Sequence, residues 1–107
     1  MFARKLSIRV KLEQFSEFTR IFEREIVPLL RQQKGFKDEI VLASVGSRDV
    51  LVLSLWESSE DADAYHDSAH KDALTLLANM IETNPRVGTP DVLHTTLYES
   101  DATVSRI

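Results

Sequence analysis

Three histidines are the side chains best suited to moving protons in this chain, because imidazole alone titrates near neutral pH without help. They are His66, His70 and His94. A base of this kind can deprotonate a phenol or an activated carbon and leave an electron-rich anion. We predict His94 and His66 as the catalytic residues. The alternative is structural: a core or interface histidine for His94, and a solvated or lightly packed pair for the other two.

A metal centre is not expected. His66 and His70 are four residues apart and would share one face of a helix, but no Glu completes a zinc-protease pattern. The chain has no cysteine, so thiolate ligands and thiol redox chemistry are excluded. It also lacks a phosphate-binding glycine loop, a Gly-x-Ser-x-Gly elbow and a dinucleotide fingerprint. We therefore predict no cofactor and exclude nucleotide-driven and triad hydrolase chemistry.

Aromatic and polar side chains are the candidates for ligand binding. Tyr65 combines an apolar ring with a phenolic tip, and Arg9 could hold a carboxylate or phenolate oxygen. Arg9 has an alternative role in a salt bridge between subunits, and the large ring of Trp56 has one in the core. The complete predicted binding set is Tyr65, Arg9, Ser7, Trp56, His70 and Tyr98.

The first half of the chain predicts a strand followed by a helix. Apolar and polar residues alternate over residues 2–12, which is typical of a strand with one buried face. From about Glu13 the apolar residues recur every three or four positions. Pro28 lies inside this helical pattern, so we expect a kink or a broken turn near Arg24 to Pro28. Gly35 follows at the position of a helix C-cap.

The second half predicts a hairpin, a helix and a final strand. Residues 36–45 and 49–57 form the hairpin, whose second strand is apolar on both faces. A helix then begins after Ser58 and continues to about residue 83. A loop with Gly88 and Pro90 leads to a last strand over residues 91–99, which carries His94 and Tyr98.

The predicted fold is α+β: a ferredoxin-like split βαβ arrangement, βαββαβ, with a four-stranded antiparallel sheet. Residues 1–100 form one domain and residues 101–107 a flexible tail. Two helices cover only one face of such a sheet, although its central strand is apolar on both. A second copy of the chain could cover the other face and enclose a barrel-like cavity, a homodimeric α+β barrel. In the alternative, a monomer, Val50 and Val52 are half-exposed.

The composition limits the kinds of partner that we expect the chain to bind. The 107 residues carry a net charge of −4, with basic residues interspersed among acidic ones, so nucleic acid is not an expected partner. The longest apolar stretch, residues 50–56, is too short to cross a membrane. No signal-peptide pattern opens the chain, and we expect a cytoplasmic protein.

Three stretches resemble the antibiotic biosynthesis monooxygenase (ABM) family of dimeric α+β barrels. They are Ile26-Val27-Pro28-Leu29-Leu30-Arg31 leading to Gly35-Phe36, then Leu55-Trp56-Glu57-Ser58, then residues 65–70. The resemblance covers about residues 3–99. It implies a homodimer whose barrel holds a small, often aromatic ligand. Some members oxygenate anthrone- or quinol-like substrates without metal or flavin, and the function expected here is a monooxygenase of that type.

Other members of this family bind and open haem with an Asn on the first strand, a Trp on the second helix and a nearby His. By alignment these Asn and Trp positions fall at Ser7 and Tyr65 here, and both depart from the pattern. Haem binding is therefore the weaker alternative. A non-catalytic homodimer that binds a small ligand, or is purely structural, is the other one.

Overall fold

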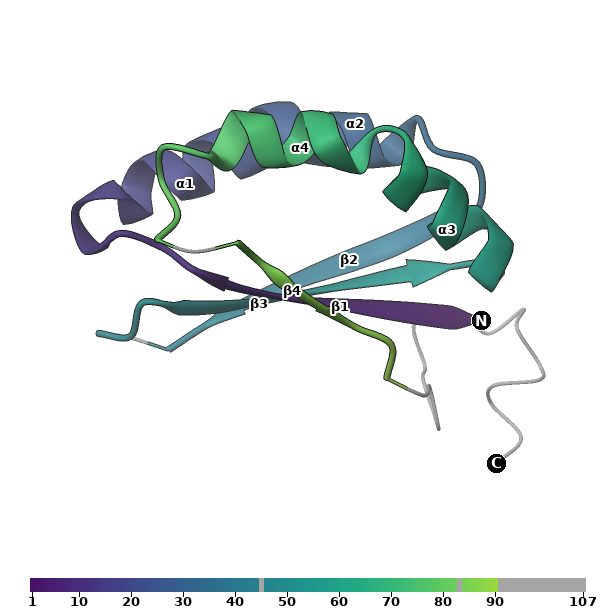
Figure 1. Ribbon diagram of the computed structural model, residues 1–107, viewed down its shortest axis with the longest axis horizontal. Coiled ribbons are helices and arrows are strands. Elements are labelled where there is room, and N and C mark those ends of the chain that lie inside the picture. Colours follow the sequence, from purple (N-terminus) through teal and green to yellow (C-terminus); the bar gives the residue numbers. More distant parts are fainter. Residues whose placement is uncertain (45, 83, 91–107) are drawn as a thin grey trace.

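A four-stranded antiparallel sheet with helices on one face makes up the described part of the chain (Figure 1). The structure, a computed structural model, describes residues 1–44, 46–82 and 84–90. The strand order is β2-β3-β1-β4, which confirms the predicted ferredoxin-like α+β fold. Within these residues no helix is long and apolar enough to cross a membrane.

Strand β1 (Phe2–Arg9) pairs with β3 (Asp49–Trp56) along its whole length. Alternation along β1 places Arg4, Leu6 and Ile8 on the face toward the helices, and Ser7 and Arg9 on the opposite face. The register sets Arg4 opposite Ser54 and Leu6 opposite Val52. One charged residue therefore lies among the apolar positions of the helix-facing side.

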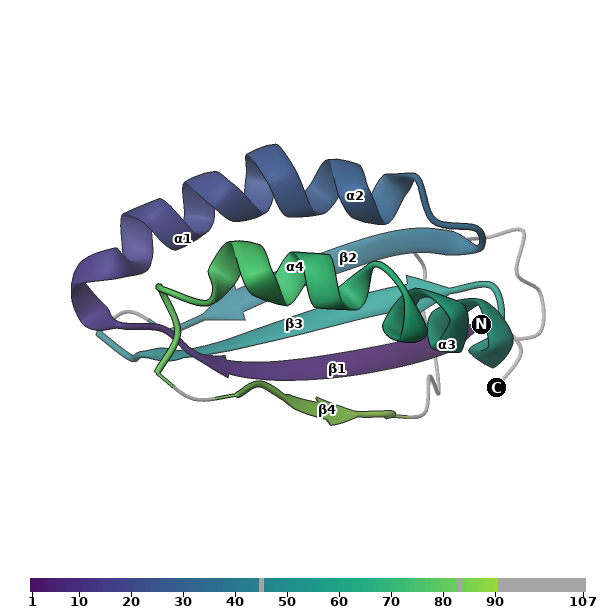
Figure 2. The same cartoon turned by 45° about the horizontal axis from the view of Figure 1, so that its top comes forward.

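The first helical region begins with a 3-10 turn, Leu12–Gln14, and continues as α1 (Phe15–Ile21), a π-helical turn (Phe22–Ile26) and α2 (Val27–Arg31). Figure 2 shows these segments as one continuous, curved rod. Pro28 has no N–H to donate to the carbonyl four residues earlier, and a wider turn relieves this conflict. The irregularity predicted near Pro28 is confirmed, as a π-helical turn rather than a broken helix.

The predicted hairpin is confirmed as β2 (Phe36–Ala43) and β3, with a bulge between Phe36 and Asp38. Gly35 precedes β2 with φ +80°, where L side chains are strained. A Cβ at Gly35 would overlap the carboxylate of Asp61, so glycine is required both by the backbone and by the helix packed against it.

The second helix was predicted as continuous, and this is wrong: it breaks into α3 (Ser59–Asp67) and α4 (His70–Leu77). Ser58 caps α3 by accepting a hydrogen bond from the Asp61 N–H at 3.2 Å. Ser68 ends α3, and its hydroxyl donates to the Ala64 carbonyl at 2.7 Å. Serine hydroxyls that bond back to the preceding turn bend helices, which accounts for the break.

The segment predicted as a loop after the second helix contains a short strand, β4 (Arg86–Gly88). It pairs with β1 at residues Lys5 to Ser7 because that edge of β1 otherwise has unpaired backbone groups. The predicted last strand over residues 91–99 and the predicted tail over 101–107 lie outside the described residues.

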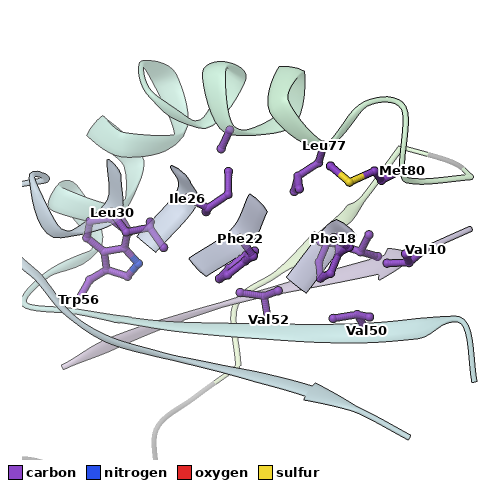
Figure 3. Packing of buried hydrophobic residues seen from close by; sticks show 13 residues of the cluster. Val10, Phe18, Phe22, Ile26, Leu30, Val50, Val52, Trp56, Leu77 and Met80 are labelled. Atoms are coloured by element: carbon purple, nitrogen blue, oxygen red, sulfur yellow. The ribbon is translucent and has the colours of Figure 1, made fainter. Parts of the chain in front are cut away.

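The core lies between the helices and the sheet. Figure 3 shows Val50, Val52 and Trp56 of β3, with Val10 just after β1, packed against side chains from both helical regions. Val50 and Val52 are 2% and 6% exposed, because the helices bury them. The apolar side chains that a second layer would have to bury lie on the opposite face of the sheet. There Ile40 and Leu42 are exposed and Leu51 and Leu53 half-buried. We call these four residues the open face.

Candidate functional site

A small pocket lies between the sheet and the helical layer, and we call it the helix-side pocket. Its free volume is about 50 Å³. Most of its wall is apolar and comes from β1, β3, the π-helical turn and α4. The lining residues that have polar side-chain atoms are Arg4, Ser54, Trp56, Tyr65, His66 and His70, and we call these six residues the polar group.

An aromatic series runs through this pocket. Trp56 stacks on Tyr65 with ring centroids 5.3 Å apart, and Phe36 meets the other side of Trp56 edge-on at 5.5 Å. The His70 ring lies edge-on to Tyr65 at 5.7 Å and stacks on His66 at 4.7 Å. Such ring pairs have defined geometries, so each member restricts the orientation of the next.

Trp56 is fully buried, which agrees with its alternative role as a core residue. It also lines the pocket. Its indole Nε1 donates to the Ser54 hydroxyl at 2.9 Å. A buried indole N–H needs an acceptor, and Ser54 interrupts the apolar run of β3 at the position that supplies it. This hydrogen bond fixes the ring that forms one wall of the pocket.

The two helical histidines come together across the break between α3 and α4. His66 is half-buried in the last turn of α3, and His70 begins α4 with 9% of its surface exposed. Burial lowers the pKa of His70, and the positive charges of His66 and Arg4 lower it further. At neutral pH His70 is thus a neutral imidazole with a free lone pair.

Tyr65 is the complementary donor. Burial raises the pKa of its phenol to about 12, so the hydroxyl keeps its proton throughout the physiological range. A neutral base and a protonated hydroxyl from adjacent turns therefore border one apolar cavity. Tyr65 lines the pocket, and its contact with a ligand stays a prediction.

Arg4 is the residue that sequence reasoning missed. It lies on the helix-facing side of β1, and its Nη2 donates to Asp63 of α3 at 2.8 Å. Its Nε is buried without a hydrogen-bond partner among the described residues. The signal was its place in the alternation, since Arg4 occupies an apolar position between Phe2 and Leu6. A charge at such a position is costly unless it is paired or functional.

Ser7 and Arg9 are not part of this pocket. Both point to the opposite side of the sheet and line a broad hollow of about 900 Å³, together with Leu42, Leu51 and Arg86. Arg9 pairs there with Asp49 at 3.3 Å and with Glu82 at 3.9 Å. The sheet thus separates Arg9 from Tyr65. Arg4 and Leu6 of β1 line the pocket, whereas Ser7, where the alignment had placed the Asn of haem-opening proteins, does not.

Two predicted residues, His94 and Tyr98, lie outside the described residues, and their roles stay predictions. Within the described ranges no group of three or more His, Cys, Asp or Glu side chains is placed to hold a metal ion.

With fold and pocket described, comparison with known proteins identifies the family. The model of the antibiotic biosynthesis monooxygenase family matches residues 1–74, and the chain belongs to this family. The matched segment contains β1, β3 and the α3–α4 break, so all the polar side chains of the pocket lie within it. No functionally curated protein matches the chain.

Solved structures show the same fold at low sequence identity. SnoaB, a cofactor-independent oxygenase from Streptomyces nogalater, superposes with a TM-score of 0.73 at 14% identity, covering 89% of this chain and 95% of that one. The ActVA-Orf6 monooxygenase of Streptomyces coelicolor, solved with nanaomycin D, gives 0.69 at 15%, covering 83% and 84%. A protein of unknown function from Nitrosomonas europaea gives 0.73 at 17%, covering 89% and 91%.

Proposed function

We propose that this chain is a cofactor-independent monooxygenase that oxidises a small aromatic or quinol-like compound in the helix-side pocket. The observation that carries the proposal is the gathering of a neutral imidazole, a protonated phenol and a guanidinium around one apolar cavity. Membership of the family and likeness to two oxygenases support it. The pocket replaces the barrel cavity as the proposed site, because the polar group faces the helices.

The proposed chemistry needs few parts. His70 accepts a proton from a phenolic or activated C–H group of the substrate, and the resulting anion donates electrons to O₂. One oxygen atom becomes the new carbonyl of the product. The other leaves as water with the two hydrogens lost by the substrate, so the substrate itself supplies every electron. Tyr65 and Arg4 stabilise the anion by donating hydrogen bonds in a site whose wall is mostly apolar.

Substrate entry requires the pocket to widen. A cavity of about 150 Å³ holds one benzene ring in a protein core, and the helix-side pocket has about 50 Å³. The break at Ser68 gives a place for this adjustment, because α3 can turn relative to α4 without loss of hydrogen bonds within either helix.

We also propose a homodimer as the working form. The open face carries four large apolar side chains, and no described helix covers it (Figure 1). An isologous contact through this face would bury them against the same residues of a second copy. The broad hollow that contains Ser7 and Arg9 would then lie at the interface, where Arg9 could still meet a ligand or a partner. A cytoplasmic location stays a prediction.

A non-catalytic ligand-binding or structural dimer is the second candidate, and the small volume of the pocket favours the purely structural form. Haem binding stays the weaker candidate. The Asn and Trp positions of haem-opening members hold Ser7 and Tyr65 here, and Ser7 lies on the face of the sheet opposite the pocket.

Oxygen uptake tests the proposal directly. Anthrone and a naphthoquinol are incubated with the protein, and O₂ consumption is compared with the uncatalysed rate, with and without EDTA. We expect EDTA-resistant uptake that falls at least about 100-fold in His70→Gln, the usual contribution of a general base. Arg24→Gln on the outer helix surface is the matched control.

His66→Gln separates the two histidines as candidates for the base. A loss confined to His66→Gln would move the role of base back to His66. No uptake above background with a panel of anthrones and quinols would refute the oxygenase and leave the non-catalytic dimer.

A further inference from the structure

Arg4 has a buried donor that no described residue accepts. Its side chain is 16% exposed and enters the fold from the centre of the sheet. Asp63 takes one amino group at 2.8 Å, and the Phe2 ring lies 5.3 Å from the guanidinium carbon. Nε is buried and has no partner among the described residues, and Arg4 is one of the residues that line the pocket. Buried donors are almost always satisfied, so this one indicates a missing acceptor.

The charges around Arg4 indicate which chemical class of hydrogen-bond acceptor its Nε–H would bind. Asp63, which pairs with Arg4 in the described part of the chain, is 63% exposed, so solvent screens much of its negative charge. The nearest titratable groups that face the pocket from the helices are Tyr65, His66 and His70, and none of them is an anion. Arg4 therefore leaves a positive potential inside an apolar cavity.

We infer that Arg4 selects aromatic ligands that carry an anionic oxygen, held by its Nε–H while the ring lies against Tyr65 and Trp56. This inference rests on the proposed function, because it assigns the substrate class of the same pocket. The shared chemistry is a negative oxygen on an aromatic ring, whether a carboxylate present from the start or a phenolate formed in the site. Arg4 is a specificity residue in either case.

A pair of isosteric probes tests the inference without turnover. Benzoate and benzamide have nearly the same shape, but only benzoate is charged. Each is titrated into ¹⁵N-labelled protein, and two resonances report on the site: the Nε–H of Arg4 and the indole N–H of Trp56, the only tryptophan in the chain. We expect benzoate to bind about tenfold or more tightly than benzamide, as a charge-assisted hydrogen bond implies, and to move the Arg4 signal downfield. Phenol titrated above and below its pKa tests the phenolate.

Variants show whether Arg4 causes the preference. Arg4→Gln should reduce it to about twofold or less, by loss of the charge-assisted bond. Asp63→Asn keeps the cation and removes its competitor, so benzoate affinity should rise. Arg24→Gln should change neither value.

Four results would overturn the inference. They are equal affinity for the two probes, a preference retained in Arg4→Gln, binding that leaves the Arg4 and Trp56 signals unmoved, and no binding of either probe. Because these readouts need no reaction, oxygen uptake with neutral substrates would still support the oxygenase after this inference had failed. An anion preference without oxygen uptake would support the inference and refute the oxygenase.

Discussion

Ser54→Ala should destabilise the fold because it leaves the indole N–H of Trp56 without its acceptor. The N–H donates to the Ser54 hydroxyl at 2.9 Å, and Trp56 has 0% of its surface exposed. The hydroxyl's own donation, to the Arg4 carbonyl, is 3.5 Å long, so its loss adds little. An unsatisfied buried donor costs about 1–3 kcal/mol.

The surroundings set the expected value within that range. The adjacent pocket of about 50 Å³ has room for one water, but its wall is mostly apolar and a buried water needs at least two polar partners. We therefore expect a loss of about 1–2 kcal/mol in the free energy of unfolding. For a domain of this length that corresponds to a fall of about 4–8 °C in Tm.

A double-mutant cycle of Ser54→Ala and Trp56→Phe, followed by urea unfolding and far-UV circular dichroism, isolates this bond. In the phenylalanine background no N–H is present, so Ser54→Ala should cost almost nothing. Thr75→Ala is the control, because it removes an exposed hydroxyl that bonds only to the Lys71 carbonyl. Protein concentration is held constant, since a dimer's stability depends on it. Equal costs of Ser54→Ala in both backgrounds would refute the reasoning.

Four further predictions concern single positions. Gly35→Ala should cost at least about 1–2 kcal/mol for its positive φ. In thermal melts Asp61→Ala should relieve only the overlap with the Asp61 carboxylate, because the Asp61 Cβ would still lie 2.6 Å from the added methyl carbon and the backbone strain would remain. His70 has a lowered pKa in the fold, so the unfolded chain binds its proton more readily, and the free energy of unfolding should fall as pH drops below about 6.5. Urea unfolding from pH 5 to 8 checks this, and an unchanged slope in His70→Gln would contradict it. The native chain should sediment at twice its 12.2 kDa, and Leu42→Lys on the open face should yield monomers; a wild-type monomer at micromolar concentration would disprove the dimer. Ala73→Leu should fill the helix-side pocket and abolish benzoate binding in the same titration while the chain stays folded.

The alternation of β1 and the doubly apolar run of β3 predicted the sheet, because a strand's side chains point to opposite faces in strict order. Pro28 predicted the irregular helix for an equally local reason, its missing N–H. The break at Ser68 could not be predicted in this way. A serine inside a helical pattern usually points to solvent, and only the folded helix shows its hydroxyl bonded to Ala64.

The candidate site, too, could be predicted from the sequence only in part. Residue types indicated histidines, Tyr65 and Trp56 as the chemical groups, and the structure brings these together through ring contacts between β3, α3 and α4. Arg9 and Ser7 were grouped with them because a sequence does not tell which face of a strand meets which helix. Arg4 was overlooked because, in the sequence alone, a single charged residue within an apolar strand resembles a solvent-exposed residue at the edge of a sheet.

By itself, then, the sequence determined the order of the elements, the two faces of each strand and the inventory of proton-transfer groups, because these depend on residue type and short-range spacing. Only the tertiary structure decided that Arg4, and not Arg9, shares a cavity with His70 and Tyr65. The physical reason is that pairing β1 between β3 and β4 assigns one of its faces to the helices. Burial there changes the pKa of His70 and leaves one arginine donor without a partner.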